Sequence, residues 1–184
     1  MTSLEAQLRE AARSGAAVSA IRSLVDLHAN IDARSNDGLR WSALHWAAER
    51  GHAPIVEQLI ALGANVHILD AAQRTPLHLA SRSGSLGAVE ILLDHNANPN
   101  APSEDNETPL HLACERGSLR CVQLLLDRRA YVNLPTRGNR TPLYVACEKG
   151  HERVVEYLLA QGADKTIQSV RTLCVRAPEC ASIT

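Results

Sequence analysis

The sequence predicts an all-α solenoid, a linear stack of antiparallel helix pairs, and a repeated motif is the main reason. The segment Thr75–His78 returns 33 residues later as Thr108–His111, and a degenerate copy, Ser42–His45, lies 33 residues before it. A third copy, altered at its last residue, is Thr141–Tyr144. The same interval separates the members of a glycine and an alanine column: Gly51, Gly84, Gly117 and Gly150, and Ala64, Ala97, Ala130 and Ala163. A repeat of this length is typical of units that bury their apolar faces only against one another.

Each unit carries the signals for two short helices. Thr75 is a natural N-cap, Pro76 suits the first helical position, and apolar residues follow. Gly84 supplies the left-handed backbone that ends a helix, which predicts a turn into a second, antiparallel helix. Valine and leucine clusters, such as the one at 89–93, fill that second helix. A short loop then leads to the next unit.

These residues resemble the ankyrin-repeat family, in which Thr-Pro-Leu-His recurs with this period. The resemblance covers four repeats at about 37–69, 70–102, 103–135 and 136–168, after a divergent N-terminal capping repeat in residues 1–36. It implies helix pairs with a β-hairpin-like finger between units, and a concave surface lined by the finger tips and the first helices. No C-terminal capping repeat is recognisable in residues 169–184.

Two features depart from the regular pattern. The second helices close with Gly63 and Gly162 in repeats one and four, whereas Asn96 and Arg129 stand at this position in repeats two and three. Left-handed backbone at a non-glycine residue costs about 1–2 kcal/mol of folding stability, so we predict that Arg129 makes the end of this helix a weak point of the stack. Before repeat one the chain is two residues longer, around Gly38, and we expect the first finger to protrude or twist.

Composition narrows the class of protein. Among 184 residues, 45% are hydrophobic but only 3% aromatic, which suits thin helical layers packed by Leu, Ala and Val. The net charge of −1 argues against general nucleic-acid binding, which needs a basic surface. No apolar run has the length of a signal peptide or a membrane span. Five cysteines without regular spacing indicate reduced thiols, so we expect a cytoplasmic or nuclear protein.

Catalytic and metal motifs are missing from the sequence. His45, His78 and His111 occupy one repeat position, and packed helices lie about 8–10 Å apart, so these side chains cannot share one zinc ion. The family resemblance implies instead that this histidine hydrogen-bonds the neighbouring finger and its own helix start. No nucleophile elbow, phosphate loop or Cys-x-x-Cys motif occurs. We therefore expect no enzymatic activity, no cofactor and no metal.

Charged residues vary between repeats at positions that the framework does not require. In the ankyrin-repeat family these positions form the binding face, so the resemblance implies a strip that contacts a protein partner. The predicted contact residues are Trp41, Arg74, Glu107 and Arg140 before the capping position, Glu104, Asp105 and Arg137 in the fingers, and Glu49, Arg50, Arg82, Glu115, Arg116, Glu148 and Lys149 at the first-helix ends. The alternative is that these charges only keep the surface solvated.

Trp41 is the most specific of these predictions. An aromatic residue on a protruding finger has no framework role, and tryptophan is enriched among residues that dominate binding energy. The alternative is that Trp41 packs down over the lengthened first loop. Trp46 replaces a framework leucine inside the following helix, and we expect it in the core.

The sequence therefore predicts a non-catalytic protein–protein interaction module, a scaffold or an adaptor. Two alternatives stay open. The segment 169–174 resembles the start of the SOCS box of ubiquitin-ligase substrate adaptors, although Val170 stands where that motif favours leucine and the remaining chain is shorter than the box. The other alternative is homo-association through an uncapped C-terminal face that buries Leu158 and Leu159.

Overall fold

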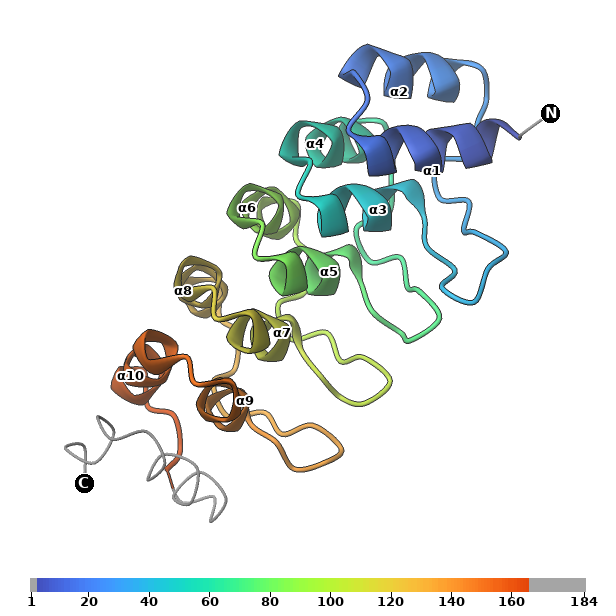
Figure 1. Cartoon of the computed structure of the whole chain (residues 1–184). Coiled ribbons are helices and arrows are strands. Elements are labelled where there is room, and N and C mark those ends of the chain that lie inside the picture. The colour runs from blue at the N-terminus through green and yellow to red at the C-terminus, as the bar shows by residue number, and fades with distance from the viewer. Residues whose placement is uncertain (1–2, 166–184) are drawn as a thin grey trace.

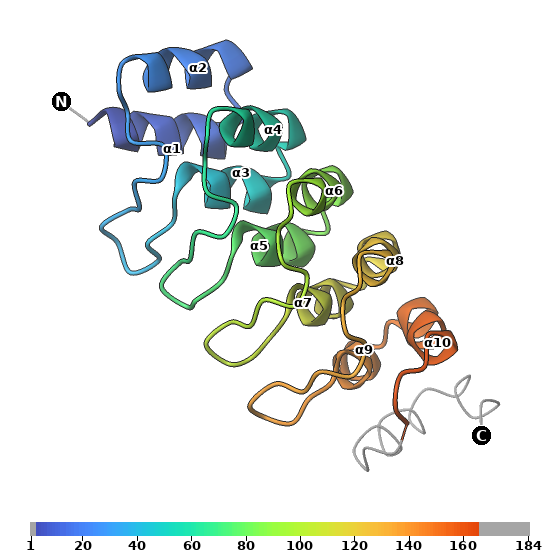
Figure 2. The ribbon, with the colours of Figure 1, turned by 180° about the vertical axis from the view of Figure 1, so that it is seen from behind.

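A computed structural model describes residues 3–165, and their ten helices stack in two layers with a row of finger loops on one side (Figure 1). The helices are α1 Leu4–Ser14, α2 Val18–Asp26, α3 Ala43–Arg50, α4 Ala53–Ala61, α5 Pro76–Ser83, α6 Leu86–Asp94, α7 Pro109–Arg116, α8 Leu119–Asp127, α9 Pro142–Lys149 and α10 Glu152–Ala160. Odd-numbered helices form the layer next to the fingers and even-numbered helices form the outer layer, as the view from behind also shows (Figure 2). The predicted all-α repeat solenoid is confirmed.

Local sequence signals set the helix boundaries. Thr75 is the N-cap of α5, and its backbone N–H donates to His78 Nδ1 at 3.1 Å in a capping box. Pro76 occupies the first helical position, where a missing N–H costs nothing. Gly84 ends α5 with a φ of 77°, and its N–H bonds the carbonyl of Ala80. The predicted helix, turn and second helix therefore form as the motif indicates.

A column of buried histidines joins each repeat to the next. In each case Nδ1 accepts from the backbone N–H of the N-cap residue, so Nε2 carries the proton and donates to a carbonyl of the following finger. The three Nε2 bonds are His45 to Arg74 at 3.2 Å, His78 to Glu107 at 3.1 Å and His111 to Arg140 at 3.0 Å. Burial lowers the pKa of all three rings to about 4, so they are neutral at pH 7. The bonding that the family resemblance implied for this histidine is confirmed.

The fingers are loops, because no β-strand forms in residues 3–165. Each loop is closed by one backbone hydrogen bond to the residue before the N-cap. In each bond a backbone N–H at the start of the loop donates to a carbonyl at its end. The pairs, with the donor first, are Ser35 and Trp41, Asp70 and Arg74, Ser103 and Glu107, and Thr136 and Arg140. The first loop is two residues longer than the others and carries the exposed Leu39. In place of the expected β-hairpin pairing, each finger has this closing bond and a turn bond, such as Gln73 N–H to the carbonyl of Asp70 at 3.2 Å.

Further backbone hydrogen bonds connect neighbouring fingers into a row. Ala71 N–H donates to the carbonyl of Leu39 in the first finger at 3.0 Å. Glu104 N–H donates to the carbonyl of Ala72, and the fourth finger is attached in the same way to the third. The loop tips therefore keep a fixed position relative to one another without strand pairing.

The second helices end in left-handed backbone in every repeat. Asn96 and Arg129 have φ values of 64° and 67° at the position where Gly63 and Gly162 have 95° and 84°. The left-handed conformation expected at Asn96 and Arg129 is therefore present. The stability cost assigned to Arg129 stays a prediction.

Candidate functional site

Trp41 does not protrude from the first finger. Its side chain is 5% exposed, and its indole Nε1 donates to Asp70 Oδ2 in the second finger at 3.0 Å. Its ring also stacks on His45 with 6.5 Å between centroids. The expected exposure of Trp41 on a protruding finger is wrong, because the side chain packs down, against the second finger and α3. The physical reason is the buried carboxylate of Asp70, which satisfies the indole N–H inside the protein.

Asp70 also holds Arg74, the second predicted contact residue. Asp70 Oδ1 accepts from the backbone N–H groups of Ala72 and Arg74 at 2.9 and 2.8 Å, and Oδ2 accepts from Arg74 Nε at 2.9 Å. Burial raises the pKa of Asp70, but the hydrogen bonds and charge of Arg74 outweigh it and lower the pKa below its usual value. The Arg74 side chain is only 19% exposed. The first two fingers therefore share an internal network of Trp41, Asp70 and Arg74.

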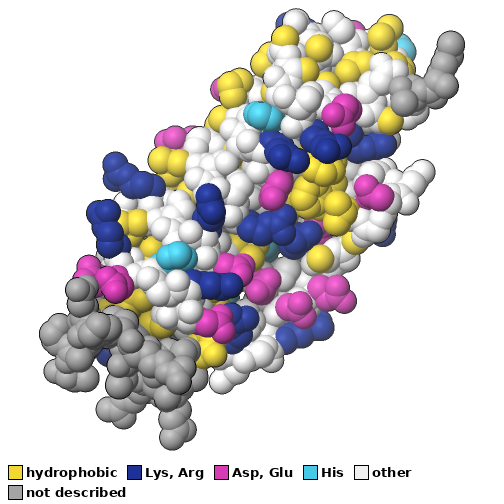
Figure 3. Space-filling model, viewed as in Figure 1, with side chains coloured by type: hydrophobic (Ala, Val, Ile, Leu, Met, Phe, Trp, Pro, Cys, Tyr) yellow, Lys and Arg dark blue, Asp and Glu magenta, His cyan; other side chains and the backbone are white. Residues whose placement is uncertain are grey.

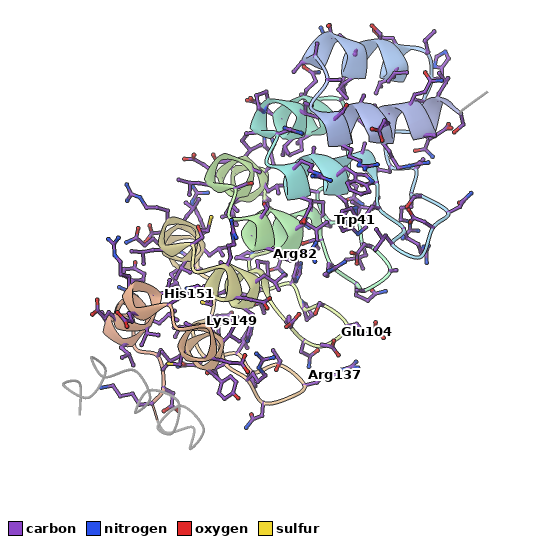
Figure 4. The ribbon with its side chains drawn as sticks, in the orientation of Figure 1. Trp41, Arg82, Glu104, Arg137, Lys149 and His151 are labelled. Carbon is purple, nitrogen blue, oxygen red and sulfur yellow. The ribbon has the colours of Figure 1, made fainter. Side chains whose placement is uncertain are left out.

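Most charges at the first-helix ends are paired with one another across repeats. Glu49 on α3 bonds Arg82 on α5 at 3.1 Å, and Glu115 on α7 bonds Lys149 on α9 at 2.9 Å. Arg82 and Lys149 both lie on the face shown in Figure 4. The Glu49–Arg82 pair is partly buried, whereas the Glu115–Lys149 pair is exposed. An exposed pair contributes about 0–1 kcal/mol, so a partner can replace the Glu115–Lys149 pair at little cost.

The other predicted residues of the helix ends occupy more exposed places. Arg50 and Arg116 are exposed at the ends of α3 and α7. Arg140 forms an ion pair with Glu148 on α9, and its guanidinium lies 5.4 Å from the centre of the Tyr144 ring. Arg140 is thus turned toward its own helix.

Trp46 lies partly at the surface, although the sequence placed it in the core. It stands on α3 where the later repeats have Leu79, at 0% exposure, and Leu112, at 4%. Its ring meets buried Trp41 edge-on at 4.5 Å between centroids, and the Arg13 guanidinium lies over it at 5.1 Å. The indole is larger than the leucine it replaces, which is the sequence signal that could have indicated its exposure.

The third finger carries three acidic residues. Glu104 and Asp105 are exposed at its tip, and Glu107 is partly buried at its base. The Glu107 carboxylate forms no hydrogen bond or ion pair with any of residues 3–165. Burial, and then the negative charges of Glu115 and Asp105, raise the pKa of Glu107. The positive charges of Arg140 and Arg74 act in the opposite direction on this pKa but do not outweigh those causes, and neither arginine forms an ion pair with Glu107.

The fourth finger places a positive charge beside this acidic group. Arg137 is exposed, and its backbone N–H donates to the carbonyl of Asp105 at 2.9 Å. Figure 4 shows Glu104 and Arg137 on neighbouring finger loops, away from the helices. Charged side chains of both signs cover this face, with an apolar patch beside them toward its N-terminal half (Figure 3). We call Trp46, the third and fourth fingers, and the ends of α5, α7 and α9 the finger strip.

Metal-binding clusters and membrane-spanning helices are both absent from the described residues. Between residues 3 and 165, no three His, Cys, Asp or Glu side chains gather in a way that could hold a metal ion. None of the helices in the same range has the length and apolar character needed to cross a membrane.

Comparison with known families gives a match to ankyrin repeats. A family model described as ankyrin repeats, in three copies, matches residues 8–103 and 97–169. These two stretches include all the helices from α2 to α10 and the four fingers.

Proposed function

Because this chain belongs to the ankyrin-repeat family, whose repeats are generally protein–protein interaction modules, we propose that it binds a protein partner through the finger strip, as a non-catalytic scaffold or adaptor. One observation carries the proposal. The tips of the third and fourth fingers expose Glu104, Asp105 and Arg137 on loops that backbone hydrogen bonds hold in place.

The backbone geometry supports binding at these tips. Ser103 and Thr136 close their loops with hydrogen bonds of 2.9 and 3.0 Å, and the Arg137 to Asp105 bond joins the two loops. A surface that is already ordered loses little conformational entropy when a partner binds. Its opposite charges, side by side, favour a partner with a complementary pattern and disfavour partners of uniform charge.

The finer alternatives remain separate hypotheses. The segment 169–174, on which the ubiquitin-ligase adaptor rests, lies outside the described residues. For homo-association, Leu158 is fully buried within the chain and Leu159 is partly buried, so Leu158 offers no surface to a second copy. We propose a cytoplasmic or nuclear location for the module, which microscopy of a fluorescent fusion would test.

Site-specific photo-crosslinking tests the proposed surface. Benzoylphenylalanine replaces Asp105 or Arg137 in the finger strip, or Glu57 or Glu90 on the outer helices as matched exposed controls. Irradiation in cells that produce the protein should give a discrete crosslinked partner from the first two positions and none from the controls. Crosslinks of equal yield from the outer helices would contradict the proposal, provided that circular dichroism shows all four variants folded.

A further inference from the structure

We infer that the finger strip receives an extended peptide segment with an apolar residue at one end and a lysine or arginine about six residues away. The apolar residue packs on Trp46, and the basic residue reaches Glu107. This inference rests on the proposed function and names the chemistry of its partner.

Trp46 provides a fixed apolar contact at one end of the strip. Its inner edge packs on Trp41, which Asp70 holds in place through the indole hydrogen bond. The Arg13 guanidinium lies over the ring at 5.1 Å, so an apolar partner residue meets the part of the indole that Arg13 and Trp41 leave exposed, and that part cannot move away without breaking buried contacts. Tryptophan held in this way is the residue type that most often dominates protein interfaces.

Glu107 provides the charged contact at the other end. Two neighbouring cations could neutralise it, but Arg74 is bonded to Asp70 and Arg140 is bonded to Glu148. Its other close neighbours, Asp105 and Glu115, are acidic, and Glu115 is already paired with Lys149. A partly buried carboxylate in this setting gains more from an external cation than a fully solvated one does, because water screens it less.

The distance between these two contacts sets the spacing in the partner. Trp46 lies on α3, and Glu107 precedes α7, two repeats further along the stack. Packed helices are about 8–10 Å apart, so the two side chains are separated by roughly 20 Å. An extended chain covers this distance in about six residues at 3.3–3.6 Å per residue. A helical partner would need about 13 residues at 1.5 Å per residue, which places its two contact residues more than three turns apart.

Selection of peptides from a random 12-residue phage library on the immobilised full-length chain tests the inference. Selected sequences should pair an aromatic or aliphatic residue with Lys or Arg about six positions away. The best synthetic peptide is then titrated by fluorescence anisotropy against three variants. Trp46→Leu, which restores the residue type of Leu79 and Leu112, and Glu107→Lys should each weaken binding at least tenfold. Glu90→Lys, the same change on the outer helix α6, should leave affinity within twofold.

A charge exchange adds a second requirement. Replacing the basic residue of the peptide by glutamate should abolish binding to the parent protein and recover it with Glu107→Lys. Failure of that rescue, selected peptides without a basic residue at this spacing, or no selected peptide at all would overturn the inference. If Asp105→Lys or Arg137→Glu still weakens binding of the crosslinked partner, the proposed function stands although the inference about the peptide fails. If no substitution in the finger strip weakens binding of any partner, the proposed function and the peptide inference are both wrong.

Discussion

The second and third fingers have the same backbone but use their charged residues differently. At the base of the second finger Arg74 is tied to Asp70, and Asp70 is tied to Trp41. At the base of the third finger Glu107 has no such partner, because Ser103 stands in the place of Asp70. The Ser103 hydroxyl accepts only the Glu107 backbone N–H, at 3.1 Å. A carboxylate has a second oxygen for a side chain and a hydroxyl does not, so this one residue decides whether the charged side chain at the base of the finger is held internally.

The fourth finger resembles the third in this respect. Thr136 occupies the same position, and its hydroxyl accepts the backbone N–H of Arg140 at 3.2 Å. The first two fingers are therefore joined at their bases by the buried network of Asp70, whereas the bases of the third and fourth fingers have only a hydroxyl at this position. The side chain before the N-cap is thus held by Asp70 at Trp41 and Arg74, forms no ion pair within the described residues at Glu107, and is paired with Glu148 at Arg140.

The largest expected effect is one that both halves share, the acid sensitivity of the histidine column. The pKa of His45, His78 and His111 is about 4 in the folded chain, below the ordinary value of 6.5, so the unfolded chain binds protons first as the pH falls. The histidines should contribute their full share to the free energy of unfolding above pH 6.5. Between pH 6.5 and 4 the free energy of unfolding should decline, by about 2 kcal/mol per histidine at pH 5. Urea unfolding at several pH values measures this.

Replacing one buried histidine tests whether the histidine column causes the acid sensitivity. His78→Gln should flatten the decline between pH 6.5 and 4, while His95→Gln, an exposed residue after α6, should leave its slope unchanged. If the slope is the same in both variants, the buried rings do not cause the acid sensitivity.

The next largest effect should come from making the second finger resemble the third. Asp70→Ser leaves the Trp41 indole N–H unpaired and removes the partner of Arg74, which should lower the free energy of unfolding by about 3 kcal/mol. Ser103→Ala, at the same position of the third finger, should cost only about 1 kcal/mol. Equal losses in chemical denaturation would show that the two fingers do not differ as described.

Neutralising Arg74 and Glu107, which occupy the same position in the second and third fingers, should give a smaller difference in stability but a clearer contrast between the fingers. Arg74→Gln leaves the buried carboxylate of Asp70 without its cation and should destabilise the protein by about 2 kcal/mol. Glu107→Gln removes repulsion from Asp105 and Glu115, so its stability should stay within about 0.5 kcal/mol of the parent or rise slightly. Thermal unfolding at pH 7 compares them, and a destabilised Glu107→Gln variant would mean that Glu107 has a structural role.

The smallest expected effect concerns the end of α8. Arg129→Gly should raise the free energy of unfolding by about 1 kcal/mol, because its left-handed backbone suits glycine. Gly162→Ala, at the same position of the last repeat, should lower it by a similar amount. An unchanged melting temperature for Arg129→Gly would remove the idea of a weak point in the stack.

Short-range signals allowed much of the fold to be predicted. The N-cap Thr75, the turn residue Gly84 and the histidine His78 act within a few residues or recur in every unit, so their period shows their role. The burial of Trp41 could not be predicted in the same way. It depends on Asp70, 29 residues away, and on a bond between two fingers that occurs once in the stack.

The repeat columns predict a charged strip, and its role in binding stays a prediction. They could not show that Arg74 is held internally by Asp70 while Glu107 forms no ion pair within residues 3–165. That difference comes from a side chain four residues earlier, Asp70 or Ser103, which the columns treat as equivalent. The large indole of Trp46 at a leucine position is a sequence signal for partial exposure, but the space that its neighbours leave for the ring could not be predicted locally.

The most direct test of the contrast compares matched changes at the tips of the two fingers. Glu104→Lys with Asp105→Lys changes the third finger, and Ala71→Lys with Gln73→Lys changes equally exposed positions of the second. Affinity for the crosslinked partner is measured for both double variants. The third-finger variant should bind at least tenfold more weakly than the parent, and the second-finger variant should bind within twofold of it. A loss confined to the second-finger variant would contradict the placement of the binding surface in the C-terminal fingers.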